Sequence, residues 1–214
     1  MISKQESWSI LIAGHWNRMI FTPEWVGSRL FHQDEVETLI ALLPIFPVIY
    51  RHSEVVLEAS AGRLVFHPRF NTDSSLEAAQ RMALTVLDDL PRTPLLGVGI
   101  NFCFIERNPP AAMLQVFNHD DDRLIARAEW DNPETTVTRK LTGQHGTLNL
   151  SLGRKADGIT IDFNFHTDTI GTIEQATAAA RQAIDGRVVR LRDTALGFMR
   201  DIYHLQLEEG DEHG

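Results

Sequence analysis

Three residues of the chain, His166, Asp162 and Asn101, have side chains that could work together in acid–base chemistry. His166 stands at the end of a strand-like segment, and Asp168 follows it just before a predicted helix. A carboxylate can hold an imidazole ring in the orientation that a general base needs. If the segment with Asn101 and Cys103 were a neighbouring strand, a thiol would complete a nucleophilic site. This set points to a small hydrolase or transferase.

Cys103, the only cysteine, is a poor nucleophile on sequence grounds. It lies in the middle of an apolar strand-like segment, whereas reactive thiols need exposure and a nearby cation or helix N-terminus. A free cysteine more often behaves as a small buried apolar residue. We therefore leave the catalytic residues unassigned, with His166, Asp162 and Asn101 as candidates, and favour a protein that is not an enzyme.

Metal and cofactor sites are not predicted either. The nine histidines form no HExxH, HxH or cysteine–histidine pattern. The acidic segment Asn118–Asp122 lacks the glycine and the final glutamate of a calcium-binding loop. Gly97 and Gly99 lie inside a strand-like segment, so they are not placed to bind a phosphate before a helix. We expect no metal and no cofactor.

The net charge of −9, from 29 acidic and 20 basic side chains, bears on the partners. A negative surface repels the phosphates of nucleic acids and of anionic lipids at long range. The chain has no signal-peptide pattern, and its apolar runs are too short to cross a bilayer. A single cysteine excludes an internal disulfide, which fits a reducing compartment. We expect a cytoplasmic protein that binds neither nucleic acid nor membrane.

Two stretches, Leu64–Asp88 and Ile161–Asp185, align without a gap and predict much of the architecture. Each runs from an alternating strand through a polar turn into an amphipathic helix, and each follows a hairpin signal. The alignment places Phe66 on Phe163. We therefore predict a hairpin–strand–helix unit that occurs twice in the chain.

The first half of the chain is expected to consist mainly of strands. Alternation predicts them over Trp8–Phe21, Val48–Arg51, Val55–Ala59, Leu64–His67 and Leu95–Ile105. Helices are predicted after the cap Thr22, from Asp34 to Leu43 with Pro44 and Pro47 as its end, and after a capping box at Ser74 and Glu77. The segment Leu95–Ile105 has one apolar and one small face, so a helix, another sheet or a ligand should press on the small face.

The second half begins after the short joint Asn108–Pro110. An acidic turn at Asn118–Asp122 is expected between two strands, and further strands and a long helical region should follow. The predicted strands are Met113–Phe117, Leu124–Trp130, Val137–Leu141, Leu148–Leu152 and Ile159–Phe165, and the helical region is Thr172–Leu207 with a weak point at Asp185 and Gly186.

These elements predict an α+β protein with an antiparallel sheet of about ten strands and a long C-terminal helix packed on it. The sheet should be built from two related halves, residues 1–107 and 108–207, in one compact domain. Residues 208–214 should form a frayed acidic tail.

The function that we predict is a non-enzymatic module that binds a ligand or protein and self-associates. The bulky stripe Val188–Leu205 is longer than one sheet half needs, so this helix or an exposed sheet edge could bind a second copy. The polar face of Ile159–His166 could bind a small molecule or a partner protein, although antiparallel sheets often leave such a face in water. The alternative is a small hydrolase or transferase with its site near His166.

Overall fold

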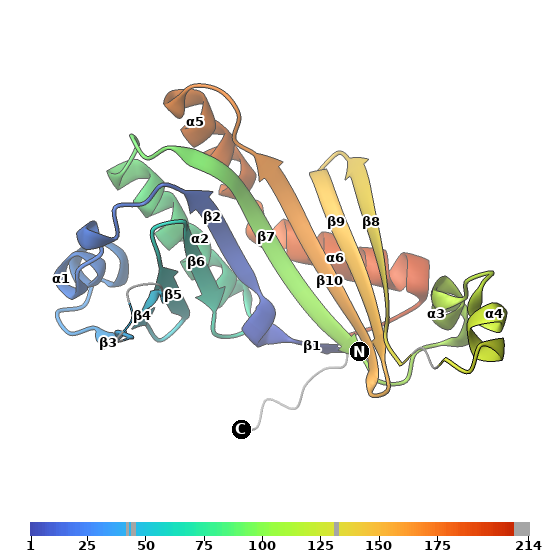
Figure 1. Cartoon of the computed structure of the whole chain (residues 1–214). Coiled ribbons are helices and arrows are strands. Elements are labelled where there is room, and N and C mark those ends of the chain that lie inside the picture. Colours follow the sequence, from blue (N-terminus) through green and yellow to red (C-terminus); the bar gives the residue numbers. More distant parts are fainter. Residues whose placement is uncertain (42, 44–45, 131–132, 208–214) are drawn as a thin grey trace.

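One antiparallel sheet of ten strands organises the protein (Figure 1). The computed structural model describes residues 1–41, 43, 46–130 and 133–207. The strand order is β3-β4-β5-β6-β2-β7-β10-β9-β8, and the short β1 pairs with β7. Helices and a large antiparallel sheet make this an α+β fold, as predicted.

The strands are β1 Ile2–Ser3, β2 Ser9–Gly14, β3 Glu37–Leu39, β4 Val48–Arg51, β5 Val55–Ala59, β6 Arg63–Pro68, β7 Leu95–Glu106, β8 Thr135–Gly143, β9 Gly146–Lys155 and β10 Gly158–Asp168. The α-helices are α1 Pro23–Val26, α2 Asp73–Asp89, α3 Ala111–Leu114, α4 Asp122–Arg127, α5 Ile173–Ile184 and α6 Val188–Tyr203. Shorter helical turns are η1 Gln5–Ser7, η2 Arg18–Ile20 and η4 Gln115–Phe117, and η3 Gly27–Phe31 is a π-helical turn.

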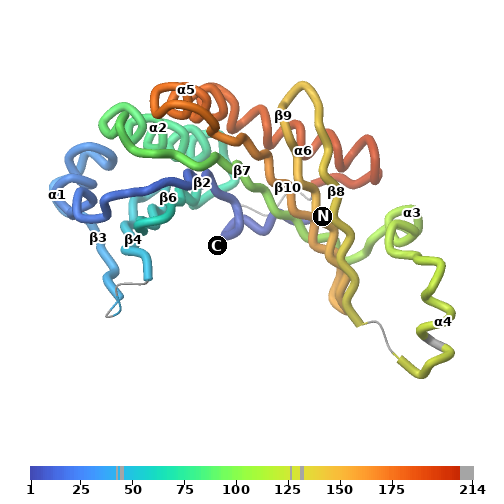
Figure 2. The backbone as a smooth tube through the Cα atoms, turned by 45° about the horizontal axis from the view of Figure 1, so that its top comes forward, coloured from blue at the N-terminus to red at the C-terminus, as the bar shows by residue number. Residues whose placement is uncertain are grey.

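The helices α2, α5 and α6 lie on one side of the sheet (Figures 1 and 2). Because one face of the sheet packs against the helices, apolar and polar residues alternate along the strands. In β10 the apolar residues Ile159, Ile161, Phe163 and Phe165 are buried in the core. The polar residues between them point to the opposite side, which we call the open face.

The C-terminal helix α6 contributes its apolar stripe to the same core. Leu191 and Met199 are buried, and the Phe198 ring meets the Phe163 ring edge-on at 5.7 Å. The helix contacts α2 and β7. The predicted weak point before it is present as a break, because Gly186 has a φ of +61° between α5 and α6. No helix within the described part of the chain is long and apolar enough to cross a membrane.

The small residues of β7 make room for side chains of the neighbouring strand. A Cβ atom on Gly99 would lie 2.9 Å from Asn164 Nδ2, and one on Gly97 would lie 3.3 Å from His166 Cε1. Asn164 and His166 therefore occupy the space over the glycines. What presses on this face of β7 is the side-chain layer of β10, which was not among the predicted alternatives.

Helix starts were predicted with mixed success. Thr22 caps α1 and Thr172 caps α5, the latter in a full capping box with Gln175. The predicted box at Ser74 is wrong, because Thr72 is the cap of α2 and its hydroxyl accepts from the Ser75 amide. The helix starts earlier than expected because the threonine offers the same cap chemistry two residues upstream.

The helix predicted from Asp34 to Leu43 is wrong. Part of this segment is the strand β3, whose residues Glu37–Leu39 pair with β4. A single short helix gains little by itself, and its apolar residues find no core, since Ile40 and Leu43 are exposed. Leu42 and Pro44 lie outside the described residues.

Two segments predicted as strands are not strands: Met113–Phe117 is helical, and Leu124–Trp130 consists of the end of α4 followed by a turn. In the first segment Met113 and Phe117 are four residues apart and both buried, which is the spacing of one helix face. In the second, Asp122 begins α4 and its carboxylate accepts from the His119 amide, so the acidic turn is a helix start.

The other strand predictions are confirmed with small changes in length. β4 and β5 have the predicted bounds, and β6, β7, β8, β9 and β10 are longer by up to a few residues at their ends. The long strand expected over Trp8–Phe21 ends at Gly14, where the pairing of β2 with β7 shifts at a bulge. The chain then turns away through η2.

Candidate functional site

A row of hydrogen-bonded amides crosses the open face. Asn149 Nδ2 donates to Asn164 Oδ1 at 2.8 Å, and Asn164 Nδ2 donates to Asn101 Oδ1 at 2.6 Å. Asn101 Nδ2 then donates to Ser9 Oγ at 3.0 Å. The row joins β9, β10, β7 and β2, because the register places these residues opposite one another. It satisfies the amide groups internally and holds the side chains in fixed orientations.

His166 lies beside the amide row and has a carboxylate partner. Its Nε2 atom is 2.9 Å from Asp168 Oδ1. The register places it opposite Gly99 on β7 and Thr147 on β9. With Nε2 protonated toward Asp168, the neutral ring carries its lone pair on Nδ1. This pair therefore has the parts of a base and its orienting group.

The other predicted site residues lie on the same face but have different partners. Asp162 lies opposite Cys103 and Ser151 in the sheet register, and Asn101 lies opposite Asn164. The strand with Asn101 and Cys103 is thus the neighbour of β10, as the hypothesis required. The carboxylate that meets His166 is that of Asp168, whereas Asp162 faces the thiol.

Cys103 is buried and has no features of a nucleophile. Burial raises the pKa of its thiol, and the hydrogen bond with Asp162 raises this pKa further. The thiolate is therefore disfavoured at neutral pH. The strands β7 and β10 thus bring a thiol, a carboxylate and an imidazole onto one face of the sheet, but the thiol is not activated.

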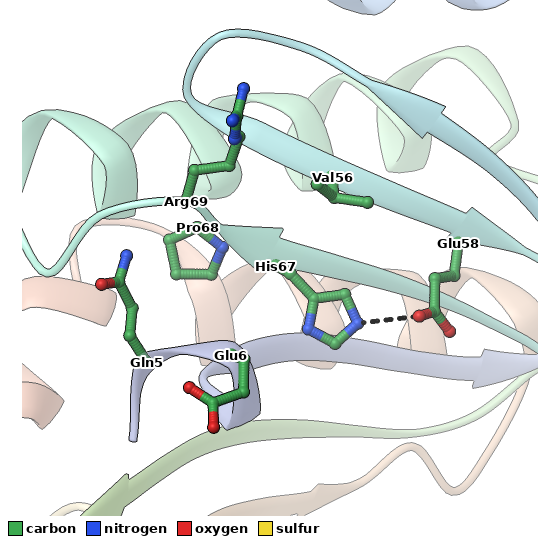
Figure 3. Close-up of a pocket in the computed structure, with 7 residues that line it drawn as sticks. All are labelled: Gln5, Glu6, Val56, Glu58, His67, Pro68 and Arg69. Atoms are coloured by element: carbon green, nitrogen blue, oxygen red, sulfur yellow. Dashed lines mark ion pairs between the residues drawn. The ribbon is translucent and has the colours of Figure 1, made fainter. Parts of the chain in front are cut away.

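A cleft of about 420 Å³ opens on the same face, between η1 and the strands β5 and β6 (Figure 3). Its lining consists of Gln5, Glu6, Val56, Glu58, His67, Pro68 and Arg69. The His67 ring lies between the side chains of Glu6 and Glu58 in this view (Figure 3). Apolar and charged groups thus face one small space.

The backbone sets the tautomer of His67. Its Nδ1 atom is 3.2 Å from the Trp8 carbonyl oxygen, which can only accept, so Nδ1 carries a proton. Its Nε2 atom is 3.4 Å from Glu58 Oε1. Nε2 is buried without a hydrogen-bond partner, and so is Nε2 of Gln5 on the other side of the cleft. Two polar atoms of one cleft therefore lack the partners that buried groups usually have.

Sequence reasoning missed this cleft because its lining comes from separate segments. The alternation of β5 and β6 does predict that Val56 and Glu58 share a face, and it places His67 across from Val56. Nothing in the sequence predicts that η1 lies beside them. The pairing of β2 with β6 brings the two together.

A second cleft, of about 220 Å³, lies on the helix side between η3 and α2. His52 lines it and packs on the Phe31 ring at 5.0 Å. Its Nδ1 accepts from the Glu54 amide, and burial lowers the pKa of the ring. Among the described residues, no group of three or more histidine, cysteine or acidic side chains is placed to hold a metal ion.

The sequence matches no protein-family model and no curated protein. The assignment of a function therefore depends on the geometry of the sheet, its edges and its clefts.

Proposed function

We propose that the protein is a non-enzymatic binding module that self-associates by pairing the edge strand β8 of two copies. The observation that supports this is the nine-residue strand Thr135–Gly143, which pairs with β9 on one side. It stands last in the strand order of the described residues. An edge of this length presents unpaired amide and carbonyl groups, which another strand can bind.

The edge strand is a better candidate than the C-terminal helix. The apolar stripe of α6, which suggested this helix as an interface, already packs inside the chain. Its residues Val188, Leu191, Ala195 and Met199 are buried. A second copy would find little free apolar surface there. β8 has threonines at four positions, and Thr136 and Thr138 are exposed. β-Branched residues favour the extended backbone that strand addition needs.

Charge disfavours some registers for two antiparallel copies of β8, and we propose one that it permits. A pair centred on Arg139 would place two guanidinium groups directly opposite each other, which is destabilising. A pair centred on Thr138 places Arg139 opposite Val137 and Lys140 opposite Thr136. In that register no like charges of the strand face each other, and both copies keep their helices on the same side.

A cysteine at position 138 tests both the assembly and the register. In the proposed register the two Thr138 Cα atoms would be about 4.5–5.5 Å apart, within the range of a disulfide. Thr138→Cys should therefore form a covalent dimer under mild oxidation. Thr142→Cys is the matched control, because it is also exposed on the open face and its copies would be roughly 27 Å apart.

Size-exclusion chromatography with light scattering should give a dimer at micromolar concentrations. A strict monomer over that range contradicts the proposal. Equal cross-linking of Thr138→Cys and Thr142→Cys would contradict the register, because random collision then accounts for both products.

The proposal includes a fold of two related halves with the C-terminal helix packed on the sheet. The order β4, β5, β6, α2 in the first half and β8, β9, β10, α5 in the second supports it. The strand β7, the last of the first half, pairs with β10 of the second half, so the two proposed halves would meet there. We also propose the cytoplasm as the location, on the basis of the single cysteine, and neither nucleic acid nor membrane as partner, on the basis of the net charge of −9.

A small hydrolase or transferase is the second candidate, and the contact of His166 with Asp168 supports it. Its test is a panel of activated esters and acyl donors with the wild type and His166→Asn. Turnover that is lost in the variant would favour this alternative. Equal rates for both proteins would exclude His166 as the base.

A further inference from the structure

The cleft of Figure 3 has more free acceptors than donors near His67. With a single proton, held on Nδ1 by the Trp8 carbonyl, the ring has its lone pair at Nε2. The nearest charged atom is Glu58 Oε1 at 3.4 Å, which is a second acceptor. A group that donates hydrogen bonds would satisfy both acceptors.

The two carboxylates determine the charge of that group. Glu6 and Glu58 lie on different sides of the His67 ring (Figure 3). An ammonium group supplies three donors and one positive charge, so beside Nε2 it can donate to the imidazole nitrogen and to Glu58, and its charge also attracts Glu6.

The rest of the lining determines the body of the ligand. Val56 and Pro68 give the cleft an apolar wall, which suits a short chain of methylene groups. Gln5 lies on the far side from Glu58 (Figure 3), and its buried Nε2 has no acceptor. An oxygen atom at the far end of the ligand would supply that acceptor. Arg69 also lines the cleft, but its Nη1 donates to the His52 carbonyl at 3.2 Å and not to either carboxylate.

We propose that this cleft binds a primary amine as its ammonium form, on an apolar stem of a few carbons with an acceptor oxygen at the other end. The ammonium lies near Glu58, Glu6 and His67, and the oxygen lies near Gln5. A free aminoalkanoate has this chemistry, and so does a lysine side chain of a protein with its own backbone carbonyl. The site is independent of the edge strand β8, so it stands or fails separately from self-association.

Isothermal titration calorimetry with 6-aminohexanoate tests the proposal. The wild type should bind it saturably with a Kd on the order of 1 mM. Hexanoate, which lacks only the ammonium, should give no saturable binding in the same range. Glu58→Gln should weaken binding by about tenfold or more, because a charge-assisted hydrogen bond becomes a neutral one. Glu77→Gln, an exposed glutamate on α2, is the matched control and should bind like the wild type.

A titration followed by NMR gives a second readout in the same proteins. The imidazole signals of His67 and the side-chain amide signals of Gln5 should shift along the same saturation curve. A melting temperature of Glu58→Gln close to that of the wild type shows that the variant is folded. Since the Glu58 side chain is 29% exposed, an isosteric glutamine should be accommodated.

A blocked lysine, Nα-acetyl-lysine methylamide, separates the two sources of the amine. Binding as tight as that of 6-aminohexanoate would assign the site to a lysine of a partner protein, and much weaker binding would assign it to a free small molecule. Equal binding of hexanoate, or unchanged binding by Glu58→Gln, overturns the proposal. Absence of saturation up to about 20 mM, roughly twenty times the expected Kd, also overturns it.

Discussion

At the scale of single residues, the open face depends on close contacts between side chains of adjacent strands. A Cβ at Gly99 would lie 2.9 Å from Asn164 Nδ2, and Asn164 is hydrogen-bonded to Asn101 and Asn149. Gly99→Ala should therefore lower the free energy of unfolding by about 1–3 kcal/mol, as measured by urea denaturation. The amide cannot move aside without losing these bonds.

Two controls make this prediction specific. Gly153→Ala should have a small effect, because its new Cβ would lie 3.9 Å from Thr136 Oγ1, an ordinary contact. In an Asn164→Ala background, Gly99→Ala should cost less than in the wild type, since the clashing amide is gone. An equal cost in both backgrounds would mean that the clash does not exist.

His52 gives a prediction for pH at the same scale. Burial lowers the pKa of its ring in the folded state, where Glu54, Arg69 and His32 also act on it. The unfolded state then binds the proton more readily, so this contribution to stability is full above the unfolded pKa of about 6.5 and is lost as the pH falls through the lowered folded pKa. The melting temperature should fall between about pH 7.5 and pH 5.5.

The melting temperature of the His52→Asn variant should fall less than that of the wild type over the same pH range. Asparagine can still accept the hydrogen bond from the Glu54 amide, but it does not titrate. Differential scanning fluorimetry at several pH values measures both proteins. Parallel curves for the two would show that His52 does not contribute to the acid sensitivity.

At the scale of elements, the packing of α6 can be tested with two residues of the same helix. Leu191 is 2% exposed and Ile202 is 56% exposed. Leu191→Ala should lower the free energy of unfolding by about 2–5 kcal/mol, and Ile202→Ala should change it by less than about 0.5 kcal/mol. Urea denaturation measures both. Similar small effects for the two variants would mean that the helix is not packed on the core.

At the scale of the whole molecule, the sheet joins the two halves of the chain. β7 pairs with β10 along ten residues of each strand, from Gly97↔Asp168 to Glu106↔Ile159. Residues 1–107 and 108–207 also share one buried core. We expect a single cooperative unfolding transition in urea, with coincident curves from tryptophan fluorescence and far-ultraviolet circular dichroism. Two separate transitions would mean that the halves fold independently.

Local chemistry alone was enough to predict several elements. The alternation in Val55–Ala59 and Leu95–Ile105 predicted β5 and β7, and Thr22 and Thr172 were recognised as caps. These features depend on side-chain period and on hydrogen bonds a few residues apart. The polar face of Ile159–His166 was predicted from the same period. The contact of His166 with Asp168, two residues further on the same face, could therefore also be predicted.

Short amphipathic segments were predicted wrongly because their period does not decide between helix and strand. The segments Asp34–Leu43 and Met113–Phe117 were each assigned the opposite structure. In both segments, tertiary contacts determine the secondary structure. Glu37–Leu39 pairs with β4 and is a strand, whereas Met113 and Phe117 are buried in the core from one helix face. Tertiary contacts of this kind outweigh the small propensity differences between residues.

The amino-acid sequence by itself determined which residues of each strand share a face, because successive side chains alternate whatever the neighbours are. Only the tertiary structure decided which faces meet. The cleft needs Gln5 beside Glu58 and His67, and the tautomer of His67 needs the Trp8 carbonyl. These contacts arise from the pairing of β2 with β6, and strand pairing over such distances depends on the whole sheet and not on any local pattern.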